Sequence, residues 1–259
     1  MATKHTLCSL APLLLAGCIA TSGENVKLVK GPPVETVTTP YDQLVGCIAS
    51  AHPMRGVWAV GDIIDATGKF SGEYAGTGKY ITQGAGDIMQ TTLLQAEAET
   101  IVNRRDPRPL LAEINLGIRS PHTFTAMNYY ITGSVNTLDF IPGAAAEITI
   151  GGIGPRYRQH RAVVGLDLHL TEATSSRVIA AVQISKQIFA DEAGFGIGRF
   201  FGDALVNLDF SGQNREPLQL SLRSMLQYGL YEMLTQIAPE LRTRCQPIVD
   251  AIEGVEEKS

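Results

Sequence analysis

The sequence predicts an α/β domain, a mixed sheet with flanking helices, which extends through two β-hairpins long enough to cross a membrane. Two observations predict this fold. Within residues 41–137, short apolar stretches of strand length alternate with stretches of helical periodicity, which favours a sheet packed against helices. Within residues 138–211, four longer stretches alternate apolar and polar side chains, a pattern typical of strands that have one apolar and one polar face.

The chain begins with an apolar run that stops at a cysteine. Residues 7–17 follow Lys4 and are about half as long as the ~20 residues that a membrane-spanning helix needs. They predict an export signal over residues 1–17. The letters LAGC that end at Cys18 resemble a lipobox, in which the cysteine receives acyl chains such as palmitate. Each buried methylene contributes about 0.8 kcal/mol to such an anchor. The alternative is an ordinary signal peptide that happens to contain a cysteine.

The residues behind Cys18 predict a lipidated tether in the bacterial envelope. Ile19, rather than Asp, follows the cysteine, which by analogy argues for the outer membrane, with the domain on its periplasmic side. Residues 18–40 lack periodicity, as expected of a linker. In an oxidising compartment Cys47 and Cys245 could form a disulfide. The sequence leaves this pairing open, because it does not show whether their Cα atoms approach closely enough.

Residues 41–137 hold the first part of the periplasmic domain. Helical spacing and short apolar runs, bounded by Gly, Pro and Asp, define each expected element. We expect helices at residues 42–49, 87–99 and 109–116, and strands at residues 56–63, 100–104 and 129–135.

Two hairpins follow. The first spans residues 138–170 and runs into the domain sheet, residues 171–182 form a domain strand and turn, and the second spans residues 183–211. The apolar parity of the strands predicts the lipid-facing side chains, which are Leu138, Phe140, Ile148, Ile150, Ala204, Val206, Leu208 and Phe210. The alternative is an ordinary soluble sheet with one solvated face.

Four strands cannot close a membrane barrel by themselves. Open edges in hydrocarbon leave backbone groups unsatisfied at several kcal/mol each. Identical copies arranged as a ring would pair these edges with one another. The hairpins are therefore expected to contribute to a shared, oligomeric outer-membrane β-barrel.

The C-terminal part is expected to contain one helix, within residues 212–240, that packs on the sheet. Its apolar residues recur at helical spacing behind Pro217, and proline is well tolerated in the first turn of a helix. Residues 241–259 are expected to form a tail.

Composition and spacing argue against catalysis. The five histidines are scattered, and no pair has the spacing of a zinc site with an acid. The glycine-rich stretches complete no phosphate-binding or dinucleotide pattern. A net charge of −5 with dispersed basic residues argues against nucleic acid as a partner. We expect no enzyme activity, no metal and no cofactor.

Several stretches together resemble the curli-secretion channel lipoproteins of the CsgG family, especially the holdfast-anchor, HfaB-like branch. No single stretch is a diagnostic pattern, but their order and spacing together are fairly specific. They are "VWAVGDIIDATGKF" at 57–70, "YYITGSVNTLDF" at 129–140, "GLDLHLTEATSSRVI" at 165–179, "SKQIF" at 185–189, "GRFFGDALVNLDF" at 198–210 and "EPLQLSLRSMLQYGLYEML" at 216–234. "TPYDQLVGC" at 39–47 favours the holdfast-type branch.

The resemblance implies a homo-oligomeric ring, a nonamer, that forms an outer-membrane channel for secreted adhesin or anchor proteins. In the curli members a loop after the first strand narrows the pore. The matching loop, residues 71–83, offers Tyr74 and Tyr80 as pore constriction candidates, although the family's Tyr-Asn-Phe pattern is absent. The alternative is that both tyrosines pack against neighbouring loops.

Two functions remain open at this point. The first is a ring-shaped channel that secretes or anchors extracellular adhesin subunits. The second is a monomeric periplasmic lipoprotein that binds and regulates another cell-envelope protein, with both hairpins folded as soluble sheet.

Overall fold

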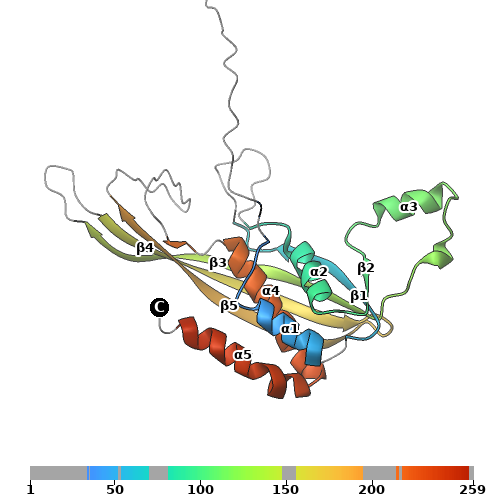
Figure 1. Ribbon diagram of the computed structural model, residues 1–259. Helices are drawn as coiled ribbons and strands as arrows, with labels where there is room; N and C mark the ends of the chain where they lie inside the picture. The colour runs from blue at the N-terminus through green and yellow to red at the C-terminus, as the bar shows by residue number, and fades with distance from the viewer. Residues whose placement is uncertain are drawn as a thin grey trace, which may run out of the picture. The chain divides into compact units, whose positions relative to one another are not determined.

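The computed structural model describes residues 34, 36–51, 54–69, 81–147, 156–194, 214–215 and 218–256. Its contacts divide the chain into two units, Met1–Thr36 and Val37–Ser259. The second unit contains every helix and strand described below, and Figure 1 shows them in chain order from blue to red.

A mixed sheet forms the base of this unit, as the sequence predicts. Its six strands lie in the order β2-β1-β3-β4-β5-β6. β1 pairs in parallel with both β2 and β3, and the remaining pairs are antiparallel. The strands are β1 (Val57–Asp65), β2 (Thr100–Asn103), β3 (Tyr129–Glu147), β4 (Arg156–Glu172), β5 (Arg177–Gly194) and β6 (Asn214–Arg215).

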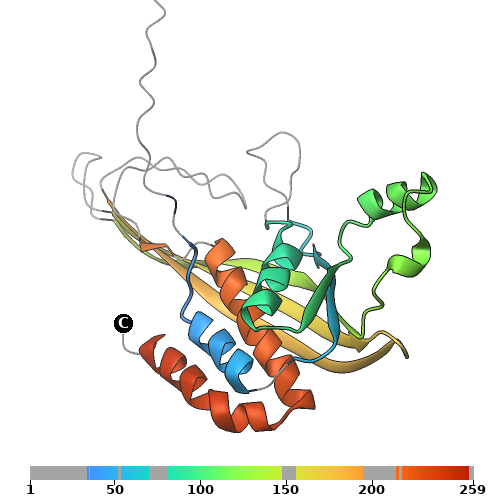
Figure 2. The same ribbon diagram turned by 45° about the vertical axis from the view of Figure 1, so that its right-hand side comes forward.

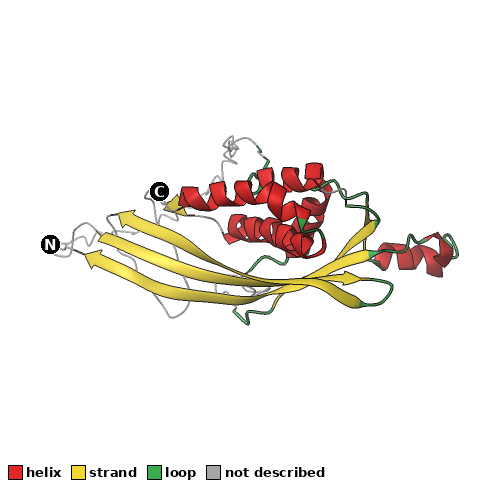
Figure 3. Cartoon of the chain, turned by 90° about the horizontal axis from the view of Figure 1, so that it is seen from below, coloured by secondary structure: helices red, strands yellow, loops and turns green. Residues whose placement is uncertain are grey.

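Four helices cover one face of the sheet, which Figure 3 shows from the side. They are α1 (Asp42–Ala51), α2 (Ala85–Gln95), α4 (Leu218–Ile237) and α5 (Glu240–Glu256). α2 packs on β1, and α4 packs on β4 and β5. The apolar stripe of α4 forms in the core because residues such as Leu222, Leu226 and Leu230 recur every four positions and are all 1% exposed or less.

α3 (Arg108–Asn115) is different from the other helices. It stands apart from the sheet and the helix layer in Figure 2, and none of its residues is buried. A short 3₁₀ helix, η1 (Pro121–Thr123), follows it before the chain enters β3.

The structure corrects the predicted strand boundaries. The strand at 129–135 and the first hairpin, which begins at residue 138, were expected as separate elements, but β3 runs from Tyr129 into the hairpin as far as Glu147, with register shifts after Val135 and Pro142. β5 likewise runs through the boundary expected at residue 183. In β3, bulges explain the difference, because an extra residue inverts the apolar parity without ending the strand.

The predicted tail at 241–259 is also wrong, since residues 240–256 form α5. Leu241, Cys245 and Val249 recur every four residues and are each 1% exposed or less. Their spacing places them on one helical face. The helix was not predicted because Pro247 and several charged residues interrupt this short apolar stripe.

Among the described residues, every helix falls short of the length and apolarity that a bilayer crossing requires.

Candidate functional site

The candidate site is the part of the sheet where β3, β4 and β5 extend past β1. β1 pairs with β3 only as far as Val135, whereas β3 and β4 remain paired through Glu147 and Arg156. Twelve residues of β3, 136–147, thus lie beyond β1. That length exceeds the ~9–11 residues of a transmembrane β-strand. Strands of ordinary domains usually have 3–10 residues in total.

The outer edge of β3 along this extension is the second feature of the site. Within the described part of the chain, no strand pairs with residues 136–147 on the side away from β4. An edge of this kind presents a row of backbone donors and acceptors that can pair with a strand from another chain. The sheet therefore offers a site for association through main-chain hydrogen bonds.

The opposite edge of the sheet, on β5, has different hydrogen-bond partners at its start and farther along. Near its start, the side-chain amide of Gln236 accepts a hydrogen bond from the Ala181 N–H at 3.2 Å and donates one to the Ala181 carbonyl at 2.8 Å. A side chain thus occupies the position of a neighbouring strand. Farther along, β6 pairs with Ala190 and Asp191. The return strand expected at 199–210 lies outside the described residues.

Two of the predicted lipid-facing residues lie within the described side chains, and the structure corrects one of them. Leu138 is 1% exposed and belongs to the core beneath the helix layer, so it does not face lipid. Phe140 is partly buried and packs against the same core. Apolar and polar side chains do alternate at the start of this stretch, but the apolar ones pack in the core of the domain and not against lipid.

The other predicted site residues fall where nothing is described. They are Cys18, Tyr74, Tyr80, Ile148, Ile150, Ala204, Val206, Leu208 and Phe210. Their assigned roles therefore stay predictions.

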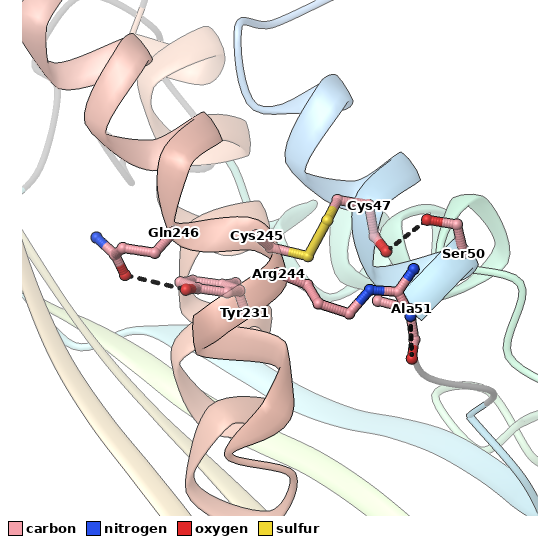
Figure 4. Close-up of a disulfide and its surroundings, with 7 residues drawn as sticks. All are labelled: Cys47, Ser50, Ala51, Tyr231, Arg244, Cys245 and Gln246. Atoms are coloured by element: carbon pink, nitrogen blue, oxygen red, sulfur yellow. Dashed lines mark hydrogen bonds between the residues drawn. A yellow bond between two sulfur atoms is a disulfide. The ribbon is translucent and has the colours of Figure 1, made fainter.

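A disulfide joins Cys47 of α1 to Cys245 of α5, with their Cα atoms 5.9 Å apart. Figure 4 shows it between the two helices, on the far side of the layer from the sheet. Close by, Tyr231 of α4 donates a hydrogen bond to Gln246 at 3.0 Å. The pairing left open by the sequence therefore fastens α5 onto the domain.

A buried amide connects the start of the domain to α4. Gln227 is 0% exposed. Its amide nitrogen donates to Asp42 at 2.6 Å, and its oxygen accepts a hydrogen bond from the Thr39 hydroxyl. A buried amide is costly unless it is paired, so these bonds fix where the chain enters the domain. The sequence analysis missed this residue, and its only signal was a glutamine among the apolar residues of a helix.

Two tyrosines of α4 have shifted pKa values: Tyr228 is partly buried and Tyr231 is fully buried in the helix layer. Burial and, secondarily, the charge of Glu232 raise the pKa of Tyr228 far above its usual value. Burial also raises the pKa of Tyr231. No group of three or more His, Cys, Asp or Glu side chains suited to a metal ion occurs among the described residues.

The comparison with known families decides the identity of the fold. The model of the family "Curli production assembly/transport component CsgG" matches residues 49–249. The chain belongs to the CsgG family. Residues 57–65 and 129–135, whose sequence suggested the resemblance, form the paired strands β1 and β3 of this CsgG-family domain.

The individual proteins that this chain resembles share little of its sequence. HfaB of Caulobacter vibrioides, whose name describes it as a transcription activator protein, is 24% identical over 97% of this chain and 86% of its own length. The PelC dodecamer of Paraburkholderia phytofirmans shares 15% identity at a TM-score of 0.32, over 70% of this chain and 89% of that one. The LpoB C-terminal domain of Salmonella enterica shares 13% identity at a TM-score of 0.31, over 56% and 94%. Scores this low assign neither assembly nor partner.

Proposed function

We propose that this CsgG-family chain is one subunit of a ring-shaped outer-membrane channel that secretes or anchors extracellular adhesin subunits of the holdfast or curli type. Family membership supports a secretion or anchoring role in general. The observation that carries the channel is the continuation of β3, β4 and β5 beyond β1, where no strand among the described residues pairs with the outer edge of β3. A shared barrel pairs that edge with a strand of the next copy.

The remaining parts of the proposal follow the sequence. Cys18 carries the acyl chains that hold each copy at the outer membrane, with the domain on the periplasmic side. Tyr74 and Tyr80 line the narrowest part of the pore, where aromatic side chains favour an extended chain over a folded one. The family resemblance implies a nonamer. The partners are other copies, outer-membrane lipid and the secreted protein.

Other functions receive less support. A transcription activator contacts nucleic acid, whereas this chain has a net charge of −5 and basic residues dispersed along its sequence, which argues against such contacts. In a monomeric regulatory lipoprotein, no strand from another chain would pair with the long outer edge of β3.

A basic substitution in the predicted return strand tests the channel. Val206→Arg places a charge on the lipid face at a cost of about 2–4 kcal/mol near mid-bilayer, so we expect the variant to be lost from the heat-sensitive oligomer that is extracted from the membrane. Asn207→Arg is the matched control, because the neighbouring residue points into the lumen and tolerates the charge. Equal membrane extraction and assembly of both variants would contradict a transmembrane strand at 199–210.

A further inference from the structure

β2 forms one edge of the sheet. It pairs with β1 on one side, and among the described residues no strand pairs with its other side. Its four residues, TIVN, include neither a proline nor a charged side chain, the residues that commonly protect an edge against pairing. The backbone groups on the free side of β2 can therefore pair with an extended segment of another chain.

A pocket lies beside this edge, on the face of the sheet that the four helices leave uncovered. Ile101 packs against the core, and successive side chains of a strand point to opposite faces, so Val102 points away from the helices. Val102 lines the pocket together with Leu110 and Phe124, which belong to the segment between β2 and β3. The volume of about 210 Å³ is below the ~300–1,000 Å³ of sites for small-molecule ligands. The pocket therefore suits one apolar side chain of a chain that pairs with β2.

Arg104, which directly follows β2, gives the pocket a positive charge. Its guanidinium donates to the Thr125 carbonyl at 2.6 Å and lies 5.5 Å from the centre of the Phe124 ring. Both partners are neutral, and no acidic side chain of the described residues forms an ion pair with Arg104. Arg119 also lines the pocket, but it is paired with Glu113 at 2.6 Å. The Arg104 guanidinium is thus held in place and suited to a carboxylate from outside the domain.

The pocket lies at the end of the sheet opposite the strand extension. β2 pairs with the first four residues of β1, which lie beside the start of β3, whereas the extension begins at residue 136. Figure 1 shows β2 and α3 at one end of the sheet and the extension at the other. With the extension in the membrane, as proposed above, the pocket lies at the periplasmic end of the domain. A polypeptide that approaches the channel from the periplasm meets this end first.

We propose that an extended, acidic segment of the secreted polypeptide pairs with the free edge of β2. Val102 and Arg104 are two residues apart and share one face, so the added strand places two of its own side chains beside them at the same spacing. An apolar side chain enters the pocket beside Val102, and a carboxylate two residues away binds Arg104. The inference rests on the proposed channel and names a site at which its cargo is recognised.

Peptide binding to the full-length protein in detergent tests this site. The probe is the peptide Thr-Val-Thr-Asp-Thr-Val-Thr, which has blocked ends and an uncharged dye, so that the aspartate is its only charge. We expect it to bind about five- to tenfold more tightly than the same peptide with asparagine, because only the aspartate makes a charge-assisted hydrogen bond. Fluorescence anisotropy measures both affinities. Equal affinities would overturn the proposal.

Arg104→Gln should abolish the preference for the aspartate peptide. Glutamine keeps a donor for the Thr125 carbonyl but lacks the charge. Arg108→Gln is the matched control, because Arg108 belongs to the same segment, is paired with Asp106 at 2.7 Å and does not line the pocket. We expect the control to keep the wild-type preference. A preference that Arg104→Gln retains would overturn the assignment of the carboxylate to Arg104.

Backbone methylation of the probe tests the strand pairing itself. Alternate N–H groups of an extended peptide point to one edge, so one version is N-methylated at the odd positions and a second at the even positions. We expect one version to lose binding and the other to retain it. Equal binding by the two versions would overturn strand addition, and displacement of the probe by inorganic phosphate would then indicate a simple anion site.

Light scattering on the same samples separates this inference from the proposed function. An oligomeric protein that does not prefer the aspartate peptide overturns the β2 site and leaves the channel untouched. A monomeric protein with a preference that depends on Arg104 overturns the ring and supports the peptide site. Loss of the oligomer in Arg104→Gln would assign the edge of β2 to a neighbouring copy and so overturn the peptide site.

Discussion

At the scale of single residues, the fold depends on a few contacts between distant parts of the chain. The disulfide closes a separation of 198 residues between α1 and α5, and Gln227 joins α4 to Asp42. Both contacts hold α1 or α5, which pack chiefly on α4 and on each other, whereas α4 packs on the sheet. They therefore determine whether the start and end of the domain stay docked.

Cys47→Ser tests the role of the disulfide. Loss of a cross-link that closes so long a loop is expected to cost about 2–4 kcal/mol of unfolding free energy. Thermal unfolding followed by Trp58 fluorescence should move to lower temperature in the variant. A reducing agent should shift the wild type to the same midpoint and leave the variant unchanged. Equal midpoints without reductant would show that α5 docks without the disulfide.

At the scale of elements, β3 and β4 form the ladder on which the extension depends. Gly133 of β3 pairs with Leu168 of β4, and a Cβ there would press against the backbone carbonyl of Asp167 and the side chain of Leu168. Backbone cannot move aside as a flexible side chain can. The glycine therefore permits the long pairing to pass beneath the helix layer.

Gly133→Ala is expected to destabilise the domain by about 1–3 kcal/mol, the usual cost of overpacking. Gly46→Ala is the matched control, because a Cβ at this position of α1 meets nothing within 4 Å and alanine favours helix by about 0.5–1 kcal/mol. Denaturant unfolding of the two variants measures the difference. A Gly133 variant as stable as the Gly46 variant would disprove the close approach.

Tyr228 of α4 makes the stability of the helix layer sensitive to alkaline pH. Its pKa is raised in the folded state by burial, with a further contribution from Glu232. The unfolded chain releases the phenolic proton near pH 10, so stability is complete below that pH and falls as the pH rises above it.

Tyr228→Phe removes this titration. Between pH 9 and pH 11 the denaturant midpoint should fall less in the variant than in the wild type. Tyr130→Phe, on the sheet, controls for loss of a tyrosine and should keep the wild-type fall. An identical pH dependence in all three proteins would contradict a raised pKa of Tyr228 in the folded state.

At the scale of the whole molecule, the sequence predicted the α/β class and the positions of most elements, because apolar periodicity survives wherever one face is buried. It failed at α5, where three buried residues are separated by charges and Pro247. It failed again at Leu138, because apolar and polar side chains alternate in the same way whether helices or lipid cover the apolar face of a strand. The exposed position of α3, none of whose residues is buried, was not predicted either, because a short amphipathic helix normally packs on its own domain.

The central claim is that several copies complete one another's sheet edges in the membrane. The most direct measurement is size-exclusion chromatography with light scattering on the protein extracted in detergent. We predict a single oligomeric species of high mass that dissociates to protomers on heating. A protomer-sized species before heating, with Cys18→Ala equally soluble without detergent, would contradict the shared barrel.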